Sequence, residues 1–254
     1  MKSIKLVLTA FSESFSLIRI IGLKKYYFIP GILGAFLFIL MMIGANFISG
    51  GLLNYLENIF NISEYHSIIS MILKITIWIV VASIYFLIYK SVLLVILSPF
   101  MGYVSEKVDN YLTGKEYDFS FNDNMRFIWR GIQIGVKSFI KQLIGMFIIM
   151  LCSFLFPINL SIPLLMFLLQ GYFTGFSFID YTLERYNFTP EESLKFLKKQ
   201  RFYSLWIGSI FTILFLIPFI GIFIAPLVTC VAATKVTLEP VSYTHLTLPT
   251  NSLV

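Results

Sequence analysis

The feature that most constrains the fold of this chain is an uncharged run of 21 residues, Phe28–Ile48. A helix rises about 1.5 Å per residue, so this run is long enough to cross about 30 Å of hydrocarbon. A second apolar run, Ile68–Leu97, carries only Lys74 and Lys90, whose long side chains can reach opposite headgroup layers. The two runs predict two long transmembrane helices, the second of which ends at Ser98-Pro99.

The composition agrees with a membrane protein. Hydrophobic residues make up 58% of the chain and charged residues 13%, with a mean hydropathy of +0.86. A soluble domain has about 45–50% apolar and about 25% charged residues, so a single soluble core cannot bury this much apolar surface. A cytosolic enzyme, a disordered protein and a disulfide-rich secreted scaffold are excluded. Cys152 and Cys230 both lie in apolar runs, so we expect neither a disulfide framework nor a thiolate metal site.

Residues 4–19 have the pattern of an amphipathic helix. Apolar residues recur at spacings of three and four along one face, and polar or basic residues do so along the other. The apolar face comprises Ile4, Leu8, Phe11, Phe15 and Ile18. Because this pattern is typical of helices in the membrane interface, we expect the segment to lie there.

Two later apolar segments are too short to cross a membrane alone. Leu143–Phe156 has 14 uncharged residues and Trp206–Ile217 has 12, whereas a spanning helix needs about 17–25. Prolines follow each segment, at 157 and 163 and at 218 and 226, before a second apolar stretch. We predict two re-entrant helical hairpins, which dip into the membrane and return to the same side. The alternative is four full spans, lengthened by Lys137 and Lys141 reaching the interface.

Local signals predict helices between the apolar runs. A polar helix is expected to end near Thr113-Gly114. Residues 189–192 read Thr-Pro-Glu-Glu, which predicts a helix start with Thr189 as N-cap, proline in the first turn and Glu192 closing a capping box. A basic stripe follows one helix face at Arg126, Arg130, Lys137 and Lys141.

The distribution of lysine and arginine predicts the orientation. Residues 49–67 contain none, whereas the N-terminal segment has five, residues 98–141 six and residues 181–205 five. Because positively charged loops stay in the cytoplasm, we expect a multi-pass protein with a cytoplasmic N-terminus and residues 49–67 outside.

No pattern in the chain predicts catalysis, a cofactor or a metal site. The sequence lacks GxGxxG, a Walker loop, HExxH and any cysteine–histidine metal spacing. His66 falls in the predicted outer loop. Asp180 and Glu184 are four residues apart at the end of an apolar segment, and Arg185 is adjacent, so we expect a local ion-pair cluster at the interface.

The candidate binding site is Gly22-Leu23-Lys24-Lys25, at the start of the first long apolar run. Free backbone N–H groups and the positive end of a helix dipole attract anions, and the two lysines add charge. The alternative is an anchor that contacts lipid headgroups, and spacing alone favours this anchor because basic pairs flank many membrane helices.

Several short motifs occur in a characteristic order. They are Gly22-Leu23-Lys24-Lys25 with Pro30; Ser98-Pro99-Phe100-Met101-Gly102 with Glu106 and Leu112-Thr113-Gly114; Ile179-Asp180-Tyr181; and Ile217-Pro218 and Ala225-Pro226 with Ala232-Ala233-Thr234. Together they resemble the CysZ sulfate permease family, which is related to the eukaryotic etoposide-induced membrane proteins. The resemblance covers about residues 10–240.

The resemblance implies an inner-membrane protein with two long spanning helices, two half-penetrating hairpins and a homo-oligomeric assembly. It also implies sulfate uptake that feeds cysteine synthesis. The sulfate-binding turn of that family has a Gly-x-Arg-Arg pattern, which corresponds here to Gly22, Leu23, Lys24 and Lys25. Lysine offers a point charge where arginine offers a two-pronged donor, so anion attraction survives the difference better than sulfate selectivity.

Two functions are therefore weighed. The first is a channel-like permease for sulfate or a related oxyanion in the bacterial cytoplasmic (inner) membrane. The second is a non-transporting membrane scaffold of the same family, which binds anionic lipids or partner proteins through its basic face. An enzyme and a nucleic-acid partner are not expected.

The last 14 residues differ from the rest of the chain. Residues 241–250 read Val-Ser-Tyr-Thr-His-Leu-Thr-Leu-Pro-Thr, which matches the translation of a transposase-type sequencing adapter. We therefore interpret 241–254 as an artefact and expect residues 1–240 to form one membrane domain whose natural C-terminus is missing. The alternative is a short natural tail.

Overall fold

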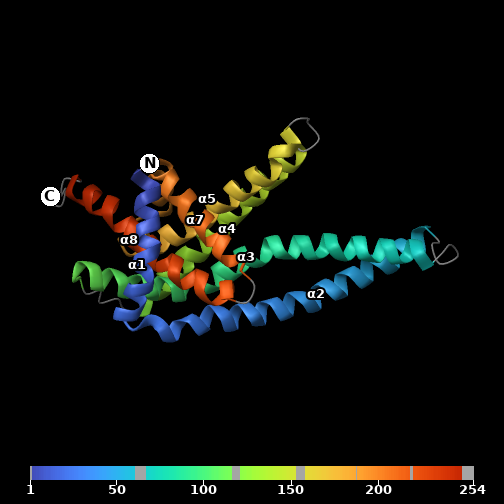
Figure 1. Cartoon of the computed structure of the whole chain (residues 1–254), viewed down its shortest axis with the longest axis horizontal. Coiled ribbons are helices and arrows are strands. Elements are labelled where there is room, and N and C mark those ends of the chain that lie inside the picture. Colours follow the sequence, from blue (N-terminus) through green and yellow to red (C-terminus); the bar gives the residue numbers. More distant parts are fainter. Residues whose placement is uncertain are drawn as a thin grey trace. The chain divides into compact units, whose positions relative to one another are not determined.

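The computed structural model describes residues 2–60, 67–115, 121–152, 158–186, 188–217 and 220–247. Within these ranges the chain forms helices and the turns between them, and no strand (Figure 1). The order is α1 (Lys2–Ile20), the 3₁₀ helix η1 (Leu23–Tyr27), α2 (Phe28–Phe60), α3 (Ser67–Thr113), α4 (Phe121–Cys152), the 3₁₀ helix η3 (Ile158–Ser161), α5 (Ile162–Arg185), α6 (Pro190–Lys199), α7 (Arg201–Phe215) and α8 (Ile220–Thr247). The predicted all-α fold is confirmed.

Among the residues that the structure describes, four helical segments are long and apolar enough to cross a membrane. They are Leu23–Leu52, Trp129–Cys152, Ile162–Arg185 and Ile220–Glu239. The second and third have 24 residues each. They are longer than the uncharged runs in the sequence because each helix continues through charged residues. Their length alone does not separate re-entrant hairpins from full spans, so the hairpins stay a prediction. Part of each predicted hairpin turn, at residues 157 and 218–219, lies outside the described residues, as do residues 153–156 before the first turn.

The helices fall into two compact units. One unit, Gly31–Leu94, holds most of α2 and the first part of α3. Within it, the Tyr89 hydroxyl donates a hydrogen bond of 2.9 Å to the carbonyl of Gly34. The Tyr89 ring also meets Phe38 edge-on, with 6.2 Å between centroids. These contacts join the two helices of this unit about two to three turns into α2.

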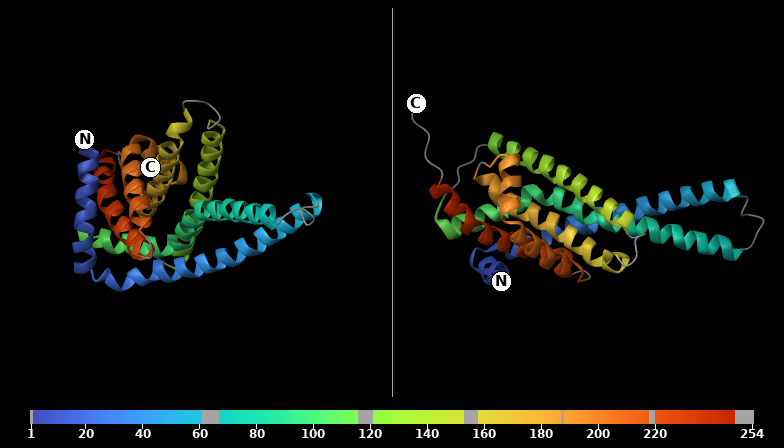
Figure 2. Two further views of the ribbon diagram at one scale, coloured as in Figure 1. Left: turned by 45° about the vertical axis from the view of Figure 1, so that its right-hand side comes forward. Right: turned by 90° about the horizontal axis from the view of Figure 1, so that it is seen from above.

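The second unit comprises Met1–Pro30 and Val95–Val254. In it α1, α8, α7 and α5 lie side by side, and α4 packs against α5 (Figure 2). Glycine allows α5 and α7 to touch through their backbones. A Cβ atom on Gly175 would overlap the carbonyl oxygen of Ser204, and one on Gly208 would overlap that of Gly171. Small residues spaced by four permit this close approach in membrane helices.

The predicted amphipathic helix is confirmed as α1, but only part of the apolar face that was expected in the membrane interface is exposed. Val7, Phe11 and Ile18 are buried against the neighbouring helices, whereas Leu8 and Phe15 are 52% and 51% exposed. The buried face is rotated by about one residue from the apolar face predicted from the sequence, because α8 packs against that side of α1. The exposed apolar edge at Leu8 and Phe15 is what remains available for a membrane interface.

Two prolines that were expected to interrupt the helices do not do so. Pro99 lies inside α3, which continues to Thr113, and Pro226 lies inside α8, which begins at Ile220. The prediction that the second helix ends at Ser98-Pro99 is therefore wrong. Apolar helices tolerate proline where neighbouring helices compensate for the lost hydrogen bond. The predicted end near Thr113 is confirmed, and Gly114 follows with φ of +68°.

The capping box at the start of α6 is confirmed. The backbone N–H of Glu192 donates to Thr189 Oγ1 at 3.3 Å, and the backbone N–H of Thr189 donates to Glu192 Oε2 at 2.7 Å. The hydrogen bonds that the Thr189 backbone N–H and hydroxyl donate to the Glu192 carboxylate lower the pKa of Glu192 below its usual value. At the other end of the chain α8 runs to Thr247, so its last turns include residues 241–247. The interpretation of 241–254 as an artefact stays a prediction.

Candidate functional site

The predicted binding turn joins α1 to η1. Gly22 has φ of +79°, the left-handed conformation that favours glycine, and its N–H donates to the carbonyl of Arg19 at 3.3 Å. Leu23 is only 2% exposed, so it anchors the turn in the protein. The side chains of Lys24 and Lys25 are exposed. The buried Leu23 therefore holds the turn against the protein, while the ammonium groups of Lys24 and Lys25 stay on the protein surface.

The first α-helical residue after the turn is Phe28, three residues beyond Lys25. The two lysines thus lie in η1, ahead of α2 rather than in its first turn. The Lys25 Nζ atom lies 5.1 Å from the centroid of the Tyr26 ring, and the Tyr26 hydroxyl shares a hydrogen bond of 3.4 Å with that of Tyr103. Lys25 therefore lies beside a pair of tyrosine side chains, Tyr26 and Tyr103. Anion binding at Gly22–Lys25 stays a prediction.

A second polar cluster, which the sequence did not predict as a unit, lies inside the protein. Arg130 on α4 donates from its two terminal nitrogens to the two carboxylate oxygens of Asp180 on α5, at 3.3 Å each. The same guanidinium donates to Ser193 Oγ on α6 at 2.8 Å. Glu184, one turn after Asp180, lies 4.0 Å from Arg130. One arginine therefore connects three helices.

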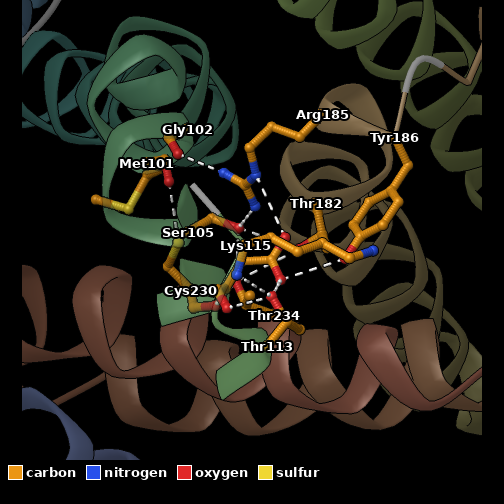
Figure 3. Close-up of polar contacts among 11 residues, drawn as sticks. Met101, Gly102, Ser105, Thr113, Lys115, Thr182, Arg185, Tyr186, Cys230 and Thr234 are labelled. Atoms are coloured by element: carbon orange, nitrogen blue, oxygen red, sulfur yellow. Dashed lines mark hydrogen bonds and ion pairs between the residues drawn. The ribbon is translucent and has the colours of Figure 1, made fainter. Parts of the chain in front are cut away.

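The next residue, Arg185, faces α3 instead (Figure 3). It donates to the carbonyl of Gly102 at 2.6 Å and to the hydroxyl of Ser105, and it lies 3.9 Å from the carboxylate of Asp109. Asp109 also accepts a hydrogen bond of 3.2 Å from the Tyr186 hydroxyl. This part of the network joins the last turns of α3 and α5.

Hydroxyl groups extend the network to α8. Ser105 lies within hydrogen-bonding distance of Thr182 at 3.1 Å and of Thr234 at 2.7 Å, so α3, α5 and α8 meet at one point (Figure 3). Nearby, the thiol of Cys230 donates to the carbonyl of Met101 at 3.3 Å. All five residues are buried. Cys230 is therefore a packing residue on α8.

The predicted ion-pair cluster at the end of α5 is confirmed, but its partners differ from those expected. The adjacent Arg185 was the expected partner of Asp180 and Glu184, whereas Arg130 takes that role and Arg185 pairs with Asp109. Arg130 belongs to the basic stripe predicted from the sequence. The spacing of that stripe did not indicate that the Arg130 side chain points into the protein. In the described part of the chain, no three histidine, cysteine or carboxylate side chains are grouped to hold a metal ion.

The turn and most of the buried network fall within the segment that matches a family model. The model for "Sulfate transporter CysZ/Etoposide-induced protein 2.4" matches residues 10–226. The chain belongs to this family. The resemblance on which the sequence interpretation relied is thereby confirmed.

Individual family members are similar at a modest level. A protein named "Sulfate transporter CysZ" from Pseudomonas fluorescens strain Pf0-1 is 27% identical over 171 residues, which cover 65% of this chain and 67% of that protein. One of the same name from strain Pf-5 is 28% identical over 137 residues, or 52% and 54% of the two chains. The chain thus spans between about half and two thirds of the length of these curated relatives.

Proposed function

We propose that this chain is a channel-like permease for sulfate or a related oxyanion in a bacterial cytoplasmic membrane, with its N-terminus in the cytoplasm. Its family membership and the name "Sulfate transporter CysZ" of its relatives support this substrate class. The proposal includes a homo-oligomeric assembly and two re-entrant hairpins, α4–α5 and α7–α8.

The observation that carries the proposal is the exposure of Lys24 and Lys25 on a turn anchored by Leu23. A tetrahedral oxyanion needs positive charge and N–H donors in one place, and two adjacent ammonium groups supply up to six donors. Because the backbone of Gly22 is fixed in a left-handed conformation, the two lysines start from a defined turn. The turn is therefore suited to collecting an oxyanion from water.

Sulfate-dependent thermal stabilisation of the detergent-purified protein tests the site. The double change Lys24→Gln with Lys25→Gln removes both charges, and charge-assisted hydrogen bonds contribute about 1.5–3 kcal/mol each. Sulfate affinity should therefore fall by about tenfold or more. The double change to arginine should keep binding or strengthen it. Chloride at matched ionic strength controls for screening.

A matched control is available on α6, where Lys198 and Lys199 also form an adjacent exposed pair. Changing these two to glutamine should leave the sulfate effect intact. If wild type shows no sulfate-specific stabilisation, or the Lys24 and Lys25 double-glutamine variant keeps it, the two lysines are membrane anchors. Labelled-sulfate flux into liposomes then decides between a permease and a non-transporting scaffold that binds anionic lipids.

Thiol labelling tests the re-entrant hairpins. Single cysteines placed in the 157–163 and 218–226 segments should resist a membrane-impermeant reagent added outside, because both turns end inside the membrane. A cysteine at Ser63, in the predicted outer loop, should react. Strong external labelling at both hairpin turns would show full spans.

A further inference from the structure

Two lysines from different helices flank a pair of tyrosines on the surface of the second unit. Lys25 Nζ on η1 lies 5.1 Å from the centroid of the Tyr26 ring, and Lys107 Nζ on α3 lies 5.7 Å from the centroid of the Tyr103 ring. The two tyrosine hydroxyls are 3.4 Å apart and share a hydrogen bond, although the residues are 77 positions apart in the chain. Two ammonium groups and two hydroxyls therefore gather at one place, the lysine–tyrosine cluster.

Aromatic packing holds the two tyrosine rings in position. The Tyr26 and Tyr103 rings meet edge-on, with 5.8 Å between centroids, and the Phe100 ring lies 5.6 Å from that of Tyr26. Phe100 and Tyr103 are three residues apart on α3, so they share one helix face, which receives Tyr26. A lysine carries its charge on a flexible stem and sets no direction, whereas a packed ring places its hydroxyl. The cluster thus combines mobile charge with directed donors.

The tyrosine pair can donate to a further acceptor. Each phenol has one O–H hydrogen, and the hydrogen bond between the two hydroxyls uses only one of them. Its length of 3.4 Å exceeds the usual distance of about 2.7–2.8 Å between two hydroxyls, so the contact is weak. Tyr103 is 40% exposed, and Lys25 and Lys107 are exposed. An acceptor from solution can therefore reach both the hydroxyls and the ammonium groups.

The charge around the pair favours an anion. The ammonium groups of Lys25 and Lys107 both interact electrostatically with the Tyr26 hydroxyl. Lys24 adds a third exposed ammonium group next to Lys25, whereas Glu106 brings one negative charge near the other hydroxyl. Among these residues, positive charge is in excess. A ligand that satisfies both lysines and both hydroxyls must be negative and must present several oxygens, as a tetrahedral oxyanion does.

We propose that Tyr26, Tyr103 and Lys107 bind the same tetrahedral oxyanion as the turn Gly22–Lys25, so that the anion is held between η1 and α3. The lysines supply charge from both segments, and the tyrosine hydroxyls donate to the anion's oxygens. For sulfate as the bound anion, the inference rests on the proposed function. The phosphate group of an anionic lipid presents the same chemistry, so the two sources are tested separately.

Thermal unfolding of the detergent-purified protein, titrated with sodium sulfate or with short-chain phosphatidylglycerol, tests the cluster. Lys107→Gln removes a charge, and Tyr103→Phe removes a hydroxyl while keeping the ring. Because hydrogen bonds to charged groups are strong, each change should weaken the affinity for the stabilising anion by about tenfold or more. Lys107→Arg should retain binding, since it keeps the charge. Sodium chloride at matched ionic strength controls for screening.

Two matched controls separate direct contact from general charge. Lys115→Gln removes a lysine that also lies over a tyrosine ring, 5.4 Å from the centroid of Tyr186. Tyr111→Phe removes the hydroxyl of a tyrosine on α3 that is 53% exposed. Both variants should bind the anion as wild type does. Equal losses in Lys107→Gln and Lys115→Gln would show that long-range charge alone attracts the anion, and would overturn the proposal.

The two titrations also separate this inference from the proposed function. Sulfate stabilisation that is lost in the Lys24 and Lys25 double-glutamine variant, but retained in Lys107→Gln and Tyr103→Phe, would refute the inference alone. Stabilisation by the lipid alone, weakened in Lys107→Gln and Tyr103→Phe, would support the cluster as a headgroup site and refute sulfate binding at the turn. If neither titrant stabilises wild type, both proposals are wrong.

Discussion

Arg130 holds the carboxylate of Asp180 through both terminal nitrogens, at 3.3 Å each, and this pair joins α4 to α5. The side chains are 13% and 4% exposed, so little water screens the interaction. The same arginine reaches Ser193 on α6, at the residue that follows the capping box. The position of α6 therefore depends on a charge located 63 residues earlier in the chain.

Arg130→Met should destabilise the protein more than Asp180→Asn. Removing the arginine leaves two carboxylates, Asp180 and Glu184, buried without their cation, and breaking a buried pair costs about 3–5 kcal/mol. The Asp180 change leaves Arg130 with Glu184 as a partner, so its cost should be smaller. Chemical unfolding in detergent micelles measures both free energies. The opposite ranking would show that Arg130 and Glu184 do not interact.

Gly175→Ala should disrupt the contact between α5 and α7. The added methyl group would overlap the backbone of Ser204, which cannot move without shifting a whole helix. Overpacking costs about 1–3 kcal/mol, and a backbone clash belongs at the upper end of that range or above it. Yield of folded protein and thermal unfolding measure the effect. Gly50→Ala, where a Cβ atom meets nothing within 4 Å, should change neither by a comparable amount.

Gly22→Ala should cost stability through the backbone alone. A Cβ atom there meets nothing within 4 Å, but φ of +79° is unfavourable for an L-residue by about 1–2 kcal/mol. Gly22→Asn should cost less, because asparagine tolerates this conformation better. Thermal unfolding of the two variants compares them directly. Equal costs for alanine and asparagine would mean that something other than φ decides this position.

The capping box of α6 should weaken in acid. Hydrogen bonds from Thr189 lower the pKa of Glu192 in the folded protein, below its ordinary value of 4.5. Its contribution is therefore fully present above pH 4.5 and disappears as pH falls through the lowered folded pKa. Glu192→Gln should remove this pH dependence, and Thr189→Ala should cost about 0.5–2 kcal/mol at neutral pH. Amide hydrogen exchange in residues 190–199, measured between pH 3 and pH 7 in the wild type and both variants, follows the effect.

Local patterns predicted the features whose causes are local. Thr189 and Glu192 are three residues apart, and the geometry of a helix start brings them together whatever the rest of the fold does. The end of α3 at Thr113 followed from Gly114, whose positive φ suits the position after a helix. The long apolar run from Phe28 likewise predicted α2 without reference to any other helix.

Pairings over long distances in the sequence were not predictable. The pattern around Arg130 looks like one member of an exposed basic stripe, because nothing within a helical turn reveals that Asp180 lies opposite it. Arg185 was assigned to its own neighbours for the same reason, although Asp109 on α3 is its partner. Pro99 was read as a helix end because an isolated helix would break there. Packing inside the protein decides all three cases.

The glycine contact between α5 and α7 also limits how the protein can move. Where two backbones touch at Gly171, Gly175 and Gly208, neither helix can slide or tilt without a collision, so the pair behaves as a single rigid body. By contrast, α3 and α4 meet α5 through side chains such as Ser105 and Arg130, without contact between their backbones at these residues. For the proposed transport, we therefore expect movement where α3 or α4 meets α5 rather than between α5 and α7.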